Sequence, residues 1–209
     1  VTTRRREVSG HPRTLLICCG ALAREIVALV KDNGWDDTMR VECLPAHLHN
    51  APDRLPEAIQ AKIRSGRARY DDVIVLYGDC GTGGMLDAVL EEEGVTRIDG
   101  AHCYEVYAGS GGFAALMEAE PGTFFLSDFL ARHFDRLIIK GLGLDRFPGL
   151  RDTYFGNYKK LVYLAQTQDG ELEDSARAAA ARLGLAFEMR FTGYGGYQDF
   201  LAAHRAPPA

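Results

Sequence analysis

A strand that runs directly into a glycine-rich turn and then into a helix constrains the fold of this chain most strongly. The strand is the apolar, β-branched run Asp72–Leu76, the turn is Tyr77–Gly84, and the helix begins at Met85. Such a run is typical of a parallel strand that is buried on both faces. In a parallel sheet this join lies at the carboxyl edge, where open α/β folds bind their ligands. The sequence therefore predicts an α/β fold with a site near Tyr77–Gly84.

Strand-like and helix-like segments alternate along the rest of the chain. The other expected strands are residues 14–19, 40–44, 95–98, 123–126, 160–166 and 185–191. Such alternation predicts a doubly wound, mostly parallel sheet of six or seven strands with helices on both faces, which is a three-layer α/β/α fold. We expect one domain over residues 14–209 after a flexible tail at residues 1–13, and Gly109–Gly112 is expected to be a mobile lid or a linker.

Composition argues against several classes of protein. The net charge is −5, and no basic stripe with interleaved aromatic residues appears, so a nucleic-acid partner is not expected. No apolar run reaches the roughly 18 residues that a membrane-spanning helix needs, so no membrane partner is expected either. Five cysteines form an odd number in a chain without an apparent export signal. That number favours reduced thiols and a cytoplasmic location over a disulfide framework.

Three cysteines share a position relative to the predicted strands. Cys19, Cys80 and Cys103 each lie just past the carboxyl end of a strand, and His47 and His49 follow the strand at 40–44. Because the carboxyl ends of parallel strands meet at one edge, these groups can converge there. Three thiolates and an imidazole suit Zn²⁺, and an iron–sulfur cluster held by three cysteines is the alternative. The simpler interpretation is that all three are ordinary core cysteines.

Individual residues near the glycine-rich turn differ in what they can do. Cys80 lies between glycines at a helix N-terminus, where a thiol pKa is lowered and the thiolate is favoured. His49 is a candidate ligand or general base, and Asp79 is a candidate general base, a residue that orients a ligand, or a turn former. An anion can be cradled at this helix N-terminus by Gly81, Thr82, Gly83 and Gly84. Neither the P-loop lysine nor the dinucleotide-binding glycine pattern is present.

The other cysteines and histidines carry weaker hypotheses. Cys18 alternates with Cys19 along its strand and therefore points to the opposite face, which makes it a core residue. Cys43 also lies inside a predicted strand and is interpreted in the same way. Whether His102 is a ligand is left open.

Several blocks of the chain resemble an uncharacterised prokaryotic family. The resemblance spans roughly residues 14–166, and Gly-x-Cys-Gly-x-Gly at Gly78–Gly83 is its most specific element. It implies that the thiols of Cys19, Cys80 and Cys103 and the imidazole of His49 belong to the family pattern. The blocks are Ile17–Glu25, Leu48–Asn50, Leu55–Glu57, Tyr77–Gly84, His102–Cys103 and Pro121–Leu126.

The resemblance also implies a biological context. Members of the family are commonly encoded beside corrinoid-dependent methyltransferases of the trimethylamine type and their corrinoid proteins. We therefore expect a zinc-binding protein of one-carbon or methylamine metabolism that transfers a methyl group or activates a thiol or water. The expected partners are a small-molecule substrate and a corrinoid protein or methyltransferase, and a homo-oligomer is left open.

Two other functions are compatible with the same residues. One is a non-catalytic accessory or sensor protein that contains a structural metal ion or an iron–sulfur cluster. The other is a metal-free enzyme with Cys80 as nucleophile and His49 as base.

Overall fold

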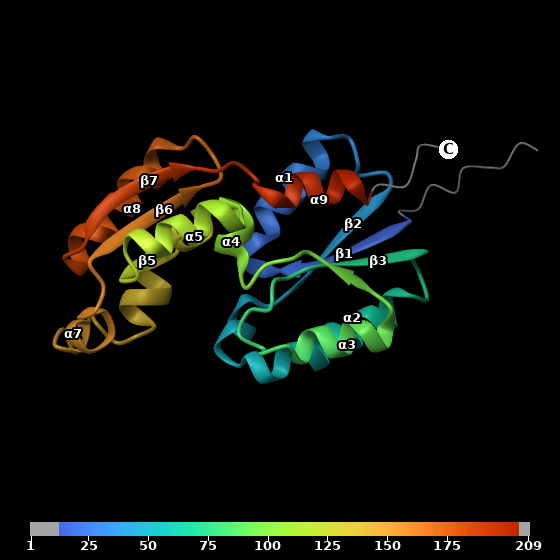
Figure 1. Ribbon diagram of the computed structural model, residues 1–209, viewed down its shortest axis with the longest axis horizontal. Helices are drawn as coiled ribbons and strands as arrows, with labels where there is room; N and C mark the ends of the chain where they lie inside the picture. Colours follow the sequence, from blue (N-terminus) through green and yellow to red (C-terminus); the bar gives the residue numbers. More distant parts are fainter. Residues whose placement is uncertain (1–12, 205–209) are drawn as a thin grey trace, which may run out of the picture. The chain divides into compact units, whose positions relative to one another are not determined.

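The structure is a computed structural model that describes residues 13–204 (Figure 1). Of the described residues, a first compact unit contains 13–77 and Thr82–Arg97, and a second contains Gly78–Gly81 and 98–204. Apart from Arg13, the tail predicted at residues 1–13 lies outside the described residues, and the single domain stays a prediction. Among residues 13–204, no helix is both long enough and apolar enough to cross a membrane.

The first unit is built on a four-stranded parallel sheet in the order β2-β1-β3-β4. The sheet consists of β1 (Thr14–Cys19), β2 (Met39–Leu44), β3 (Asp72–Leu76) and β4 (Thr96–Arg97). All six residues of β1 are buried, because this strand has a neighbour on each side. The chain adds β2 on one side of β1 and β3 on the other, so the winding direction changes between β1 and β3. In open α/β sheets, this switch point is where ligands bind.

Helices cover both faces of this sheet (Figure 1). Helix α1 (Ala23–Asp32) lies on one face, and α2 (Leu55–Gly66) and α3 (Met85–Glu93) lie on the other. The buried stripe of α1 consists of Ile26, Leu29 and Val30, at the spacing of an amphipathic helix. Three short 3₁₀ turns complete the unit, namely η1 (Gly20–Leu22), η2 (Ala46–Asn50) and η3 (Pro52–Arg54).

The second unit has a three-stranded parallel sheet in the order β5-β6-β7. These strands are β5 (Thr123–Leu126), β6 (Lys160–Ala165) and β7 (Ala186–Phe191). Leu161, Tyr163 and Ala165 of β6 belong to the same core cluster as Ala176, Ala179 and Ala180 of α8 (Gly170–Leu183). Its helical segments are α4 (Cys103–Ala108), α5 (Ser110–Ala119), α6 (Asp128–Arg132), the π-helix η4 (Asp135–Lys140), α7 (Leu150–Phe155), α8 (Gly170–Leu183) and α9 (Gly196–Ala203).

The predicted class is confirmed, whereas two details of the prediction are wrong. The described residues form parallel strands flanked by helices, as a three-layer α/β/α fold requires. However, their seven strands belong to two sheets and not to one, because β4 is only two residues long and β5 pairs with β6 instead. Gly109–Gly112 is not a loop, since Ser110–Gly112 form the first turn of α5.

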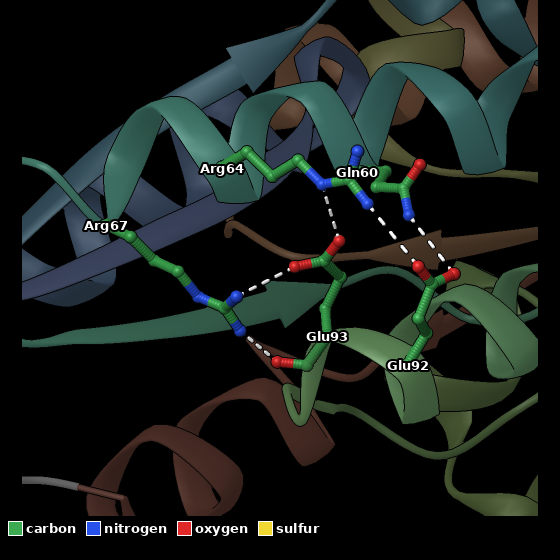
Figure 2. A network of polar contacts seen from close by, with 5 residues as sticks. All are labelled: Gln60, Arg64, Arg67, Glu92 and Glu93. Carbon is green, nitrogen blue, oxygen red and sulfur yellow. Dashed lines mark hydrogen bonds and ion pairs between the residues drawn. The ribbon is translucent and has the colours of Figure 1, made fainter.

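A network of polar side chains joins α2 to α3 in the first unit (Figure 2). Arg64 Nε donates to one carboxylate oxygen of Glu93 (2.7 Å) and Arg67 Nη1 to the other (2.8 Å), while Arg67 Nη2 donates to the Glu93 carbonyl. The Glu93 side chain is only 5% exposed, whereas that of Glu92 is 66% exposed. The hydrogen bond from Arg64, together with the charges of both guanidinium groups, holds the pKa of Glu93 below its ordinary value of 4.5.

We expect Glu93→Gln to destabilise the protein at neutral pH. The stability of the variant should also fall less than that of the wild type as the pH is lowered. Because the folded-state pKa of Glu93 is lowered, its carboxylate stabilises the fold above the unfolded-state pKa, and this contribution is lost as the pH falls through the folded-state pKa. Urea unfolding measured from neutral to acid pH tests this, with Glu92→Gln as the matched control. An effect of Glu93→Gln no larger than that of Glu92→Gln, at neutral or at acid pH, would contradict the prediction.

Candidate functional site

The switch point of the first sheet brings Cys19 next to two groups from distant parts of the chain. Cys19 ends β1, and its Sγ lies 3.8 Å from Nδ1 of His49, which is thirty residues away in the sequence. The backbone N–H of Ala21 donates to the same sulfur at 3.4 Å, and the Tyr77 hydroxyl lowers the pKa of the thiol. Tyr77 directly follows β3, so the carboxyl ends of β1 and β3 both contribute to this cluster.

A close approach of the chain after β1 and β2 positions His49. A Cβ atom on Gly20 would lie 3.1 Å from the carbonyl oxygen of Leu44 and 3.3 Å from the nitrogen of Ala46, which explains the glycine at this position. The turn η2 begins directly afterwards and carries His49 to a ring-centroid distance of 6.4 Å from Tyr77. The carboxyl ends of β1, β2 and β3 therefore place Cys19, His49 and Tyr77 near one another, and of the groups expected to converge this pairs Cys19 with His49.

The environment keeps both Cys19 and His49 uncharged near neutral pH. Burial raises the pKa of the Cys19 thiol above 9.0, although the hydrogen bond from the Ala21 N–H and the Tyr77 hydroxyl oppose the shift. Desolvation lowers the pKa of His49 below 6.5. The pair is therefore a thiol and a neutral imidazole, not a thiolate and an imidazolium. Such a pair suits a cation that replaces the thiol proton better than it suits unaided nucleophilic attack.

In the second unit, the segments that carry Cys80 and Cys103 run side by side. The Asp79 N–H donates to the carbonyl of Gly100 at 3.0 Å, and the Cys80 N–H donates to that of Ala101 at 2.7 Å. Cys103 follows two residues later, as the first residue of α4. Cys80 adopts a φ of 52°, the only positive φ of a non-glycine residue among residues 13–204. Strained backbone of this kind is concentrated at functional sites.

His102 caps a helix, a role that the sequence left open. Its Nδ1 accepts a hydrogen bond from the backbone N–H of Glu105 at 3.4 Å, at the N-terminus of α4. The Glu105 carboxylate accepts from the Ala101 N–H at 2.8 Å. The His102 ring also packs edge-on against Phe113, with 4.8 Å between the ring centroids. The capping hydrogen bond and the ring contact explain why a histidine occupies this position, so no bound metal ion or substrate is needed to explain it.

The glycine turn before α3 is explained by backbone conformation. Gly83 and Gly84 have φ values of 62° and 87°, which side-chain-bearing residues rarely adopt, and an added Cβ at either would meet nothing within 4 Å. Thr82 is buried, and its Oγ1 accepts from the Leu86 N–H at 3.3 Å, inside the first turn of the helix. Gly81 also has a positive φ, of 83°. Ligand binding by these four residues stays a prediction.

A second pair of thiols was not predicted from the sequence. Cys18 and Cys43 are register partners on β1 and β2, and their sulfur atoms lie 3.2 Å apart. Cys18 is fully buried, as predicted, but Cys43 is exposed on the edge strand and is not a core residue. The Cys18 thiol hydrogen-bonds to Cys43 and lowers the pKa of Cys43, and the pKa of Cys18 is strongly raised. Only the register of the two strands reveals this pair.

These environments predict an order of thiol reactivity. At neutral pH, we expect Cys43 to be alkylated first, because it is exposed and its pKa is lowered. Cys18 and Cys19 should react last, because both are buried and their pKa values are raised. Timed alkylation followed by peptide mass spectrometry measures this order, and the urea-unfolded chain is the control. Fast alkylation of Cys19 in the folded protein would contradict the raised pKa of its thiol.

The predicted metal ligands belong to two units. Cys19 lies in the first unit and Cys80 and Cys103 lie in the second, so their convergence stays a prediction. Within residues 13–204, no three His, Cys, Asp or Glu side chains form a group that could hold a metal ion.

Comparison with known proteins identifies a family but no characterised relative. No curated protein and no solved structure matches the chain. The family described as protein of unknown function (DUF1638) matches residues 43–201. The match begins later and ends later than the expected resemblance over residues 14–166, and it contains His49, Cys80 and Cys103 but not Cys19. Because this match covers well over half of the sequence, the chain belongs to the DUF1638 family.

Proposed function

We propose that the protein binds one zinc ion through Cys19, Cys80 and Cys103, with His49 beside the ion. The observation that carries the proposal is the 3.8 Å separation of Cys19 Sγ and His49 Nδ1 at the switch point of a parallel sheet. Thiolate sulfur and imidazole nitrogen are the ligands that zinc prefers. The second unit adds support, since hydrogen bonds hold the backbone of Cys80 beside the segment that leads to Cys103.

The protonation states of the two groups in the first unit fit this donor set. The pKa of His49 is lowered, so its ring is neutral at pH 7 and keeps a lone pair for a metal ion or a proton. The Cys19 pKa is raised, so a bound cation would displace the thiol proton. His49 and Asp79 are the candidates for accepting a proton from a substrate. When bound, zinc supplies Lewis acidity toward a thiol or water.

The proposed biological role is methyl transfer to or from a small methylated amine or thiol. It is supported by the sequence resemblance to a family encoded beside corrinoid-dependent methyltransferases. A corrinoid protein or its methyltransferase is the partner that this role requires.

Metal analysis of protein purified without chelator tests the proposal. We expect about one zinc per chain, and its loss in Cys19→Ser, Cys80→Ser and Cys103→Ser alike. Cys43→Ser is the matched control and should keep the metal, because this exposed thiol is outside the proposed set. Iron and inorganic sulfide in place of zinc would support the cluster alternative. Retention of the metal by all three variants would contradict the site.

Addition of zinc to the metal-free protein should raise its melting temperature. Because no group of three ligands is ready-made among residues 13–204, the ion has to draw its ligands together. Binding is then coupled to the folded state, and free zinc at one hundred times its dissociation constant stabilises by about 2.7 kcal/mol. A thermal shift measured with and without zinc tests this coupling, and magnesium, which prefers oxygen ligands, is the control ion. An unchanged melting temperature would contradict it.

The number of protein ligands distinguishes catalysis from a structural role. X-ray absorption spectroscopy of the zinc-loaded protein counts the sulfur and nitrogen neighbours of the ion. Three protein ligands and one exchangeable position would support catalysis, and four protein ligands would support the accessory or sensor alternative.

A metal-free enzyme with Cys80 as nucleophile is the second candidate. The observation that favours it is the positive φ of Cys80, a strained conformation in a partly exposed turn. Rapid alkylation of Cys80 in protein that contains no metal would support this candidate over the zinc site.

A further inference from the structure

Cys18 and Cys43 have the geometry of a disulfide that has not yet formed. They pair directly across the neighbouring parallel strands β1 and β2, and their sulfur atoms are 3.2 Å apart. Neighbouring strands lie about 4.8 Å apart, which falls inside the Cα–Cα range of about 4.4–6.8 Å that disulfides span. A bond of about 2.05 Å therefore needs the sulfurs to approach by roughly one ångström through side-chain rotation alone.

The two thiols are unequal in their access to solvent. Cys43 is exposed, and β2 is an edge strand of the sheet, so a small reagent can reach its sulfur. Cys18 is completely buried on the interior strand β1, with its sulfur beside that of Cys43. This asymmetry gives each thiol a role, because an outer sulfur can be attacked first and an inner sulfur can then resolve the intermediate.

We propose that Cys18 and Cys43 form a redox-active dithiol that low-molecular-weight disulfides oxidise to an intramolecular disulfide. The Cys43 thiolate attacks one sulfur of the small disulfide, which breaks its S–S bond, releases one small thiolate and leaves a mixed disulfide on Cys43. Cys18 then attacks the Cys43 sulfur, which forms the Cys18–Cys43 bond and breaks the bond to the second small sulfur, and the Cys18 proton passes to this departing thiolate, which leaves as a thiol. Two protein thiols are oxidised and one small disulfide is reduced to two thiols.

The bond would fasten the edge strand β2 to β1 at the carboxyl end of the sheet. Cys18 immediately precedes Cys19, and Leu44, which follows Cys43, is the register partner of Cys19. Oxidation would therefore fix the two strand ends that lead to Cys19 and to the turn that carries His49. The inference does not depend on the proposed zinc site, because neither Cys18 nor Cys43 belongs to that site.

Oxidised glutathione is the probe for the test, applied to the full chain and followed by non-reducing mass spectrometry. We expect the intact mass to fall by two hydrogen atoms, and trypsin to yield residues 14–24 linked to residues 41–54. Fragment spectra then assign the bond to Cys18 and not to Cys19 on the first peptide. Cys80→Ser, which removes a thiol of the second unit, should form the same bond. Dithiothreitol should reverse it.

The variants separate the two steps. Oxidation of the Cys18→Ser variant should stop at the mixed disulfide, so Cys43 should retain one glutathione. Cys43→Ser should leave Cys18 unmodified in the folded protein. If Cys18→Ser fails to fold, the wild-type peptide map decides by itself. Two free thiols at Cys18 and Cys43 after oxidation, or a bond to any other cysteine, would overturn the proposal.

Discussion

Replacing Asp128 with alanine is expected to lower the free energy of unfolding by about 4 kcal/mol, because it leaves four hydrogen-bond donors without an acceptor, two of them buried. Asp128 is completely buried at the start of α6. One of its carboxylate oxygens accepts from the Tyr163 hydroxyl at 2.7 Å and from the Gln166 N–H at 2.9 Å. The other accepts from the N–H and the hydroxyl of Thr167 at 3.0 and 2.5 Å.

Both the charge of the Asp128 carboxylate and its two acceptor oxygens contribute to the stability of the fold. Burial raises the pKa of Tyr163, and the hydrogen bond to Asp128 raises it further, so the tyrosine stays a donor. An asparagine side chain at this position would offer one acceptor oxygen, and its NH₂ group would face a donor, so Asp128→Asn should also destabilise the protein. The carboxylate connects the start of α6 to the end of β6, two segments that are 38 residues apart in the sequence.

Asp135→Ala is the matched control for Asp128→Ala. Asp135 also lies in the second unit and forms an ion pair with Arg182, but its side chain is 72% exposed. Exposed ion pairs contribute only about 0–1 kcal/mol, so the control should unfold nearly as the wild type does. Urea denaturation of the two variants gives the comparison. A loss below about 1 kcal/mol for Asp128→Ala would mean that water replaces the carboxylate at low cost.

Local sequence patterns predict the elements of this chain well. The strand at Asp72–Leu76 and that at Thr123–Leu126 have the predicted bounds, because each is an uninterrupted apolar run. The helix start at Met85 was also predicted, from the glycine turn that precedes it. Ser110–Gly112 was wrongly predicted, because the low helix propensity of glycine outweighed the apolar residues that follow.

Pairings between distant segments were harder to predict. The topology of parallel strands was enough to expect His49 near Cys19, because strand ends share one edge of the sheet. It was not enough to predict that seven strands of the described chain divide into two sheets, which depends on the short β4. The contact between Cys18 and Cys43 depends on exact register, and a shift of one residue would have turned one side chain to the opposite face.

A methyl group on Gly78 is expected to separate the two cysteine-bearing segments of the second unit. An added Cβ would lie 2.7 Å from the Gly100 carbonyl oxygen and 2.9 Å from the His102 nitrogen, and both are backbone atoms. Gly78→Ala should therefore break the hydrogen bonds from Asp79 and Cys80 to the facing segment, at a cost of about 1–3 kcal/mol. If Cys80 and Cys103 bind one ion, zinc affinity should fall at least about tenfold, since 1.4 kcal/mol is a factor of ten.

Gly83→Ala separates this effect from backbone strain in the same turn. Gly83 has a φ of 62°, yet an added Cβ would meet nothing within 4 Å. Alanine there should cost about 1–2 kcal/mol of stability through its left-handed conformation, while the hydrogen bonds of Asp79 and Cys80 stay intact. Titration with zinc and urea unfolding of both variants give the comparison. If Gly83→Ala loses zinc and Gly78→Ala keeps it, zinc binding depends on the glycine turn and not on the pairing of the two cysteine-bearing segments.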